Sequence, residues 1–557
     1  MTFNRPRSKK KGFLSNNINL NSRNKNILKK NLNKANYYFK KGIEFEKNNE
    51  FTLAIASFKN SINFNPKYSK AFNSLGCVFL KVREIDLAIE AFKKAIHYDP
   101  NYLDPLINCG ISLRNHNNLL LSIEFFKKAI ILNPTSEVLH SELGASYALS
   151  NNIEAALNSF KMAIKLNATY PEAHNNAGLI YQKLGELNKA YMHLSKALEL
   201  NPVYPEALNN IGIVLNEKRE FRQAIKSFKQ SIKYKPNFSE AHCNLGISLL
   251  TIGNYEDGWE EYEYRDLNQI GLFAPRVFSN SDRFMLNKFK CNDKISILSE
   301  QGIGDIIQFM RYIPHLEKIG VDISFYVPEK LHLLIKESGI HLNPQKPQDF
   351  LFENKRSWIP LLSIPKILKV NCDNPIISDP YLSISKKYQD KWKSILSEEN
   401  KPIIGINWQG NKDSEMGARR NRSFPLELFS ILGNLNQFKL LSLQKGFGSE
   451  QLRDCSFKNK FVNCQKIVDK AWDFCETAAI IKNCNLVITS DTSVAHLSGA
   501  LGQKTWVLLN HSSDWRWGIS GEKTFWYKSM RLFRQTNEKD WCEVMKKVSI
   551  ELNQLLF

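Results

Sequence analysis

Glycine recurs with a fixed period through the first half of the chain, and this regularity constrains the fold more than any other feature. Seven glycines stand 34 residues apart. They are Gly42, Gly76, Gly110, Gly144, Gly178, Gly212 and Gly246. A fixed period of this length is typical of stacked copies of one small unit, each of which buries its apolar face only against its neighbours. The first half is therefore predicted to be a repeat array.

Other columns keep the same period. Small residues follow each glycine by 12 positions, namely Ala54, Ala88, Ser122, Ala156, Ala190, Ala224 and Gly258. Large residues follow four positions later, namely Phe58, Phe92, Phe126, Phe160, Leu194, Phe228 and Tyr262. This pattern resembles the tetratricopeptide repeat, a helix–turn–helix unit, and it covers residues 35–268 as seven repeats. The small columns are predicted to let the two helices of a unit approach closely, and the large column to fill the space between units.

Asparagine stands two residues before the glycine in four of the units. These residues are Asn108, Asn176, Asn210 and Asn244. The column resembles the asparagine ladder of eukaryotic O-GlcNAc transferases, which implies a superhelical groove that holds a peptide or protein acceptor. A side-chain amide offers a donor and an acceptor together, so it can pair with an extended backbone of any sequence. The alternative is a solvated position that repeat duplication has copied.

The basic charge is concentrated at the N-terminus. The chain has a formal net charge of +21, and residues 1–34 carry ten Lys/Arg and no acid. This Asn/Lys-rich tail is predicted to be disordered. Nucleic acid is not an expected partner, because the remaining excess suits an anionic small ligand equally well. No apolar run approaches the ~18 residues of a membrane span, and the dilute cysteines indicate reduced thiols. We expect a cytoplasmic protein with no transmembrane segment.

The composition changes after the repeats, since all ten tryptophans lie beyond residue 258. Residues 269–292 are predicted to be a linker, and β/α alternation follows. Strands are predicted over 294–299, 321–327, 402–408, 439–443, 486–489 and 505–509, and helices over 330–338, 473–482 and 494–501. Two such sets, residues 293–385 and 401–557, joined by a helix over 386–400, predict an α/β domain of two Rossmann-like lobes that face each other across a cleft.

Three stretches carry a further resemblance. They are Ser299-Glu-Gln-Gly-Ile-Gly-Asp-Ile-Ile-Gln-Phe-Met-Arg-Tyr312, Ser490-Asp-Thr-Ser-Val-Ala-His-Leu-Ser-Gly-Ala-Leu-Gly502, and Asp514-Trp-Arg-Trp517 with Met530-Arg-Leu-Phe-Arg-Gln535. Together they resemble glycosyltransferase family 9, the heptosyltransferase-like proteins, over about residues 290–535. The resemblance implies a GT-B fold and an inverting transferase. A nucleotide sugar would be its substrate, and no cofactor would be needed.

The candidate catalytic residues lie in the first two stretches. Gly302 and Gly304 are donor-binding candidates, because they allow a tight turn that ends at a helix N-terminus. Asp305 matches the position proposed for the general base in heptosyltransferases, and the alternative is a helix cap. His496 is the next candidate and is expected to contact the donor.

The donor site is predicted mainly from the second lobe. Asp491, Thr492 and Ser493 end a strand and open a helix, where amides and hydroxyls suit a phosphate. Heptosyltransferases usually have glycine where this chain has Ser493, so the resemblance does not identify the donor sugar of this protein. Weaker donor-binding candidates are Trp408, Asn411, Arg420, Arg422 and Glu476.

Other chemistries are disfavoured by missing motifs. No Asp-x-Asp occurs in the chain, which disfavours a metal-dependent GT-A enzyme, so no metal site is predicted. The competing interpretation is a non-enzymatic scaffold, in which the array binds proteins and a degenerate transferase domain serves as an interaction module.

Overall fold

The computed structural model describes residues 13–265, 288–352, 356–411, 422–432 and 436–555. The chain forms two compact units, residues 1–203 and residues 204–557. No helix among the described residues is long and apolar enough to cross a membrane.

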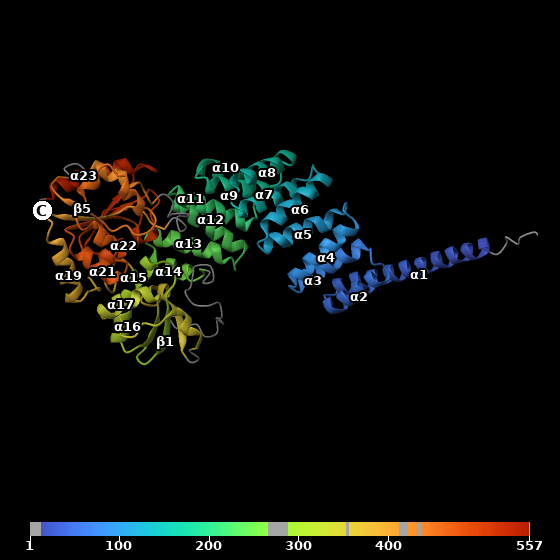
Figure 1. The fold of residues 1–557 in the computed structure, drawn as a ribbon, viewed down its shortest axis with the longest axis horizontal. Coiled ribbons are helices and arrows are strands. Elements are labelled where there is room, and N and C mark those ends of the chain that lie inside the picture. The colour runs from blue at the N-terminus through green and yellow to red at the C-terminus, as the bar shows by residue number, and fades with distance from the viewer. Residues whose placement is uncertain (1–12, 266–287, 353–355, 412–421, 433–435, 556–557) are drawn as a thin grey trace, which may run out of the picture. The chain divides into compact units, whose positions relative to one another are not determined.

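The first unit consists of helical pairs, as the repeat period predicts (Figure 1). Its helices are α1 (Phe13–Lys47), α2 (Phe51–Phe64), α3 (Ser69–Lys81), α4 (Ile85–Tyr98), α5 (Leu103–Asn115), α6 (Leu119–Leu132), α7 (Glu137–Leu149), α8 (Ile153–Leu166), α9 (Pro171–Lys183) and α10 (Leu187–Leu200). The periodic glycine lies in the first helix of each pair. A Cβ built on Gly76 would lie 2.5 Å from the ring of Phe92 in the second helix of the same pair. The ring lies over the glycine of its own unit. The large column also packs toward the next unit, as predicted, since Phe126 shares an apolar cluster with Leu143, and Phe160 shares one with Ala177 and Ile180.

The predicted disorder of the basic tail is wrong in part. Residues 13–34 belong to α1, the long helix that includes Gly42, rather than to a disordered segment. The segment from Phe13 to Lys41 contains no proline or glycine, so nothing in the local sequence interrupts the helix. Residues 1–12 lie outside the described part of the chain.

The second unit begins with two more helical pairs and continues as an α/β domain. Its helices are α11 (Pro205–Glu217), α12 (Phe221–Tyr234), α13 (Ser239–Thr251), α14 (Tyr255–Tyr262), α15 (Ile303–Phe309), α16 (Ile313–Lys318), α17 (His332–Glu337), α18 (Ile364–Ile367), α19 (Lys386–Leu396), α20 (Gln465–Asp469), α21 (Phe474–Lys482), α22 (Ser493–Ala500) and α23 (Trp541–Gln554). Its strands are β1 (Lys294–Leu298), β2 (Asp322–Tyr326), β3 (Ser357–Pro360), β4 (Ile403–Asn407), β5 (Lys439–Ser442), β6 (Leu486–Ser490), β7 (Thr505–Leu509) and β8 (Met530–Arg534).

The strands form two wholly parallel sheets, with strand orders β2-β1-β3 and β5-β4-β6-β7-β8. In each sheet the chain moves outward on one side of the first strand and then returns to its other side. The order therefore reverses between β1 and β3 and again between β4 and β6. In open parallel sheets, ligands bind outside the carboxyl ends of the strands at such reversals. The loops that follow β1, β4 and β6 are therefore the expected ligand-binding positions.

The predicted boundary at residue 268 does not separate two bodies. Leu250, Trp259 and Tyr262 of the last helical pair belong to the same buried apolar cluster as β1, β2 and α15. The Trp259 indole N–H donates to the carbonyl of Val370, 2.8 Å away. The seventh repeat is therefore part of the α/β domain's core. Most of the predicted linker, residues 269–287, lies outside the described residues.

Candidate functional site

The topological reversal of the five-stranded sheet carries a buried polar network. Asn407 ends β4, and Thr489 lies one residue before the end of β6. The Asn407 side-chain oxygen accepts hydrogen bonds from the hydroxyls of Thr489, at 3.2 Å, and Thr492, at 2.9 Å. Because β4 and β6 are neighbours, this network joins the two loops at the reversal. The buried hydroxyl of Ser490, at the end of β6, has no hydrogen-bond partner among the described residues.

Gln444, in the loop after β5, holds the other end of this network. Its side-chain oxygen accepts from the Asn407 amide at 2.8 Å and from the backbone N–H groups of Trp408 and Gln409. Its amide nitrogen donates to the carbonyls of Gln409 and Phe447. Gln444 is buried, and it fixes the loop after β4 against the loop after β5. Sequence analysis did not identify Asn407 or Gln444, although Asn407 ends a strand that was predicted.

The predicted phosphate-binding segment opens α22 directly beside this network. Asp491, Thr492 and Ser493 are all half-buried, so solvent reaches them. The carbonyl of Asp491 accepts a hydrogen bond from Arg422, at 3.1 Å. The α22 N-terminus supplies backbone N–H groups and a partial positive charge, and Arg422 adds a cation nearby. This arrangement can bind an anionic group.

The other donor-binding candidates lie in different environments. Trp408 is completely buried in the apolar core, on the face of the sheet opposite Asn407, which corrects its predicted contact with a donor. Arg420 lies outside the described residues, and Asn411 is exposed. Glu476 lies in the first turn of α21, where its carboxylate accepts from the indole of Trp392 and pairs with Lys391 at 2.6 Å. Both carboxylate oxygens of Glu476 are therefore engaged with α19.

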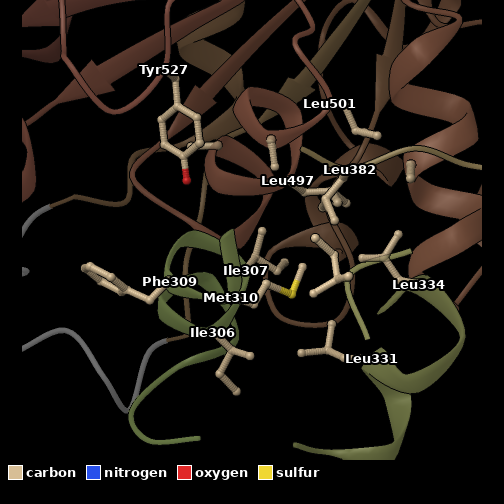
Figure 2. Close-up of a cluster of buried hydrophobic side chains, with 14 of the residues drawn as sticks. Ile306, Ile307, Phe309, Met310, Leu331, Leu334, Leu382, Leu497, Leu501 and Tyr527 are labelled. Carbon is tan, nitrogen blue, oxygen red and sulfur yellow. The ribbon is translucent and has the colours of Figure 1, made fainter. Parts of the chain in front are cut away.

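Helix α15, after β1, packs against α22, after β6. Figure 2 shows Met310, Leu331, Leu334, Leu382 and Leu497 gathered on one side of α15, while Phe309 points to the other side. A Cβ on Gly304 would lie 2.8 Å from the His496 ring, so the glycine allows this close approach. The two reversal loops, from the two different sheets, therefore converge near His496.

Asp305 occupies the third position of α15 and is not its N-cap residue. Its carboxylate accepts a hydrogen bond from the backbone N–H of the N-cap residue Gly302, at 2.9 Å. It also pairs with Arg516 at 2.5 Å, and Arg516 pairs with Asp514 at 2.7 Å. All three side chains are at least 88% buried. Sequence analysis did not assign a role to Arg516, although the Asp514-Trp-Arg-Trp517 motif contains it.

His496 is buried beside this cluster. Its Nδ1 lies 3.1 Å from the Tyr527 hydroxyl, and its ring stacks on Trp517. Burial, together with the neighbouring Arg516, lowers the pKa of His496 to about 3. The imidazole is therefore neutral at neutral pH, and its low proton affinity makes it a poor general base there.

A second buried ion pair joins the last repeat to the end of β1. Arg265, three residues beyond α14, binds both carboxylate oxygens of Glu300 at 2.7 and 3.0 Å. Glu300 also accepts from the Leu362 backbone N–H at 3.0 Å, and neither ion-pair side chain is more than 1% exposed. Trp515 packs edge-on against Trp259 of α14. The last repeat, the loop after β1 and the Asp514-Trp-Arg-Trp517 segment therefore form one rigid core.

The asparagine column is half-buried in both units. Asn108 donates to Asn73 of the preceding repeat at 3.1 Å, and Asn244 donates to Asn209 at 3.0 Å. Asn176 accepts from its neighbour Asn175 at 3.2 Å. The column is thus supported by a deeper set of buried amides that sequence analysis did not identify.

Comparison with known proteins confirms the repeats. Models described as tetratricopeptide repeat match residues 69–102, 171–204 and 210–265, and a model described as TPR repeat matches residues 146–185. Protein FlbA of Caulobacter vibrioides (strain ATCC 19089 / CIP 103742 / CB 15) is 23% identical over 333 residues, which cover 55% of this chain and 53% of FlbA. The chain thus spans about half the length of the curated relative that it matches.

Several solved structures resemble part of the chain. The Cut9–Hcn1 hetero-tetramer of APC/C is 24% identical over 39% of this chain and 43% of that chain, with a TM-score of 0.34. MamA is 28% identical over 29% and 95% of the two chains, with a TM-score of 0.27. PilF of Pseudomonas aeruginosa is 18% identical over 38% and 95%, with a TM-score of 0.33. These scores support no functional assignment. Taken together, the helical pairs and the family models show that this chain carries a tetratricopeptide array, which is followed by two small parallel sheets.

Proposed function

We propose that this protein is an inverting, metal-independent glycosyltransferase that takes its sugar from a nucleotide-sugar donor, and that its tetratricopeptide array recruits the acceptor. The carrying observation is the solvent-accessible N-terminus of α22 at the strand reversal, with Arg422 beside it. A nucleoside diphosphate fits this place because backbone N–H groups and a cation suit a pyrophosphate. The transfer of a sugar, rather than another group, follows from the three sequence stretches that resemble glycosyltransferases.

A second observation favours the scaffold alternative. Asp305, the candidate general base, is held by Arg516 in a nearly solvent-free cluster. One carboxylate oxygen of Asp305 pairs with Arg516 and the other accepts from the Gly302 backbone N–H, so both oxygens are already engaged within the protein. Protein binding by the tetratricopeptide repeats is common to both functions, so the state of the α/β domain decides between them.

Donor binding is tested by calorimetry on the full chain with UDP, GDP, ADP and CDP in EDTA. We expect one of them to bind. Ser493→Glu should then weaken its affinity at least about tenfold, because a carboxylate in the first turn of α22 repels phosphate. The same charge favours a helix N-terminus, so the melting temperature should not fall.

The matched control is Cys542→Glu, which adds the same charge to the first turn of α23, at an exposed position. It should leave nucleotide affinity unchanged. Binding that disappears on chelation would contradict metal independence. If none of the four nucleotides binds, the scaffold is the better description.

Peptide recognition by the asparagine column is tested separately. We expect the full chain with Asn108, Asn176, Asn210 and Asn244 all changed to Ala to lose affinity for a random-sequence peptide library, measured by fluorescence anisotropy. These amides are the half-exposed members of the column and can pair with a peptide backbone. Asn73→Ala with Asn209→Ala is the matched control, because it removes the same inter-repeat bonds but keeps the outer amides. Equal binding by both variants would contradict the assignment.

A further inference from the structure

The N-cap residue of the helix that opens the proposed donor site does not use its side chain to cap the helix. Thr492 is the N-cap residue of α22, yet its hydroxyl makes no hydrogen bond to the helix amides. A threonine in this position usually accepts a hydrogen bond from an N–H of the first turn. Here the hydroxyl donates to Asn407 instead, at 2.9 Å. The Thr492 hydroxyl thus does not cap the first turn of α22, although the Thr492 backbone carbonyl accepts from the Ala495 N–H at 3.0 Å.

The direction of these hydrogen bonds is fixed by the backbone. Gln444 donates from its amide nitrogen to two carbonyls, those of Gln409 and Phe447, at 3.0 and 2.8 Å. Its side-chain oxygen must therefore face Asn407 and accept from that residue's amide nitrogen. The Asn407 oxygen is consequently directed at the Thr492 hydroxyl, which donates to it at 2.9 Å, and at the Thr489 hydroxyl, which is shared between Asn407 at 3.2 Å and the Ser490 carbonyl at 2.9 Å. An amide offers a donor on one side and an acceptor on the other, so each amide sets the next bond.

We infer that Asn407 and Gln444 are positioning residues that hold the Thr492 hydroxyl away from the α22 amides and thereby keep this helix N-terminus open to an anionic group. The inference rests on the proposed function, because it assigns residues to the same donor site. Without Asn407, Thr492 needs only a rotation about its Cα–Cβ bond to cap its own helix. The cap would then occupy an N–H group that the anion needs.

The inference also revises one role within the site. The single hydroxyl proton of Thr492 is given to Asn407, so the hydroxyl has no proton for a phosphate oxygen. The backbone N–H groups of α22 and the Arg422 side chain therefore provide the donors.

The test uses the full chain, inorganic pyrophosphate as the probe, and calorimetry. Asn407→Leu removes the hydrogen bonds of the amide to Gln444, Thr489 and Thr492 at similar side-chain size and should weaken pyrophosphate binding at least about tenfold. The double variant Asn407→Leu with Thr492→Val, which cannot form the cap, should recover most of this affinity. The control Asn485→Leu removes a side-chain amide whose oxygen accepts from the Ile403 backbone N–H, at the amino ends of β4 and β6. This variant should bind pyrophosphate like wild type.

A merely structural role for Asn407 predicts that the double variant binds as weakly as the single variant, and this result would overturn the inference. Wild-type affinity in Asn407→Leu would also overturn it. If wild type binds no pyrophosphate, the proposed function fails, and the inference is then judged by melting temperature. In the Asn407→Leu background the Thr492 hydroxyl caps α22, and Thr492→Val removes that cap. Thr492→Val must therefore lower the melting temperature of Asn407→Leu by more than it lowers that of wild type. An equal shift in both backgrounds would overturn it.

Discussion

Glu300→Ala is expected to lower the free energy of unfolding of residues 204–557 by about 3–5 kcal/mol, because it removes the fully buried carboxylate of the pair and leaves the buried Arg265 with only the partly exposed Glu263. Arg265 and Glu300 are at most 1% exposed, and the carboxylate also accepts a backbone N–H from Leu362. All ten tryptophans lie in this unit, so urea unfolding followed by tryptophan fluorescence measures its stability alone.

Two variants isolate the cause of this loss. Glu300→Gln keeps an acceptor of the same shape but removes the charge, so it should be intermediate in stability. Glu263→Ala removes the other carboxylate that pairs with Arg265. The Glu263 side chain is 18% exposed, so its loss should lower the free energy of unfolding by only about 1 kcal/mol. If the free energy of unfolding of Glu300→Ala lies within about 1 kcal/mol of the wild-type value, the ion pair does not anchor the last repeat.

Asp305→Asn is expected to reduce turnover by about 10²–10⁴-fold if Asp305 is the general base. Turnover is measured as nucleoside diphosphate released from the nucleotide sugar that binds. The helix contact should survive, because an asparagine oxygen can still accept from Gly302. The substitution also removes one of the two carboxylates that pair with Arg516, so it should cost about 1–3 kcal/mol of stability.

Asp514→Asn is the matched control for this prediction. It neutralises the other carboxylate that pairs with Arg516 and should destabilise the protein to a similar extent, while Asp305 keeps its charge. Proton transfer by Asp305 therefore predicts a large loss of turnover in Asp305→Asn and a small loss in Asp514→Asn. Equal losses would mean that the intact cluster, and not a base, is what activity requires. Near-normal turnover in Asp305→Asn would leave Asp305 as a capping and ion-pairing residue.

The local features of the fold could be predicted from the sequence. A 34-residue period reports stacked helical pairs because every copy repeats the same close contact, such as Gly76 under Phe92. Strands β1, β2, β4, β5, β6 and β7 were predicted to within one residue because each is a short segment rich in apolar residues. Strand β3 ends at Pro360, a residue that argues against a strand, and β8 contains Arg531 and Arg534, so neither presents such a segment.

The candidate site could be predicted only in part. The loops that hold Asp305, Thr492 and His496 were found, because each follows a strand and opens a helix. Their partners were not found, because hydrogen-bonding partners in a parallel sheet are brought together by crossover connections. Asn407 and Thr492 are 85 positions apart, and Asp305 and Arg516 are 211 apart.

The sequence by itself determined the helical pairs of the repeat array and six of the eight described strands, because periodicity and apolar segments are local properties of the chain. The tertiary structure alone decided that the seventh repeat belongs to the α/β core, that Trp408 is buried, and that Arg516 pairs with the candidate base. These outcomes depend on which buried polar groups find partners once the sheets and helices pack. A buried polar group must be satisfied by whatever the fold places beside it, and no local pattern records that choice.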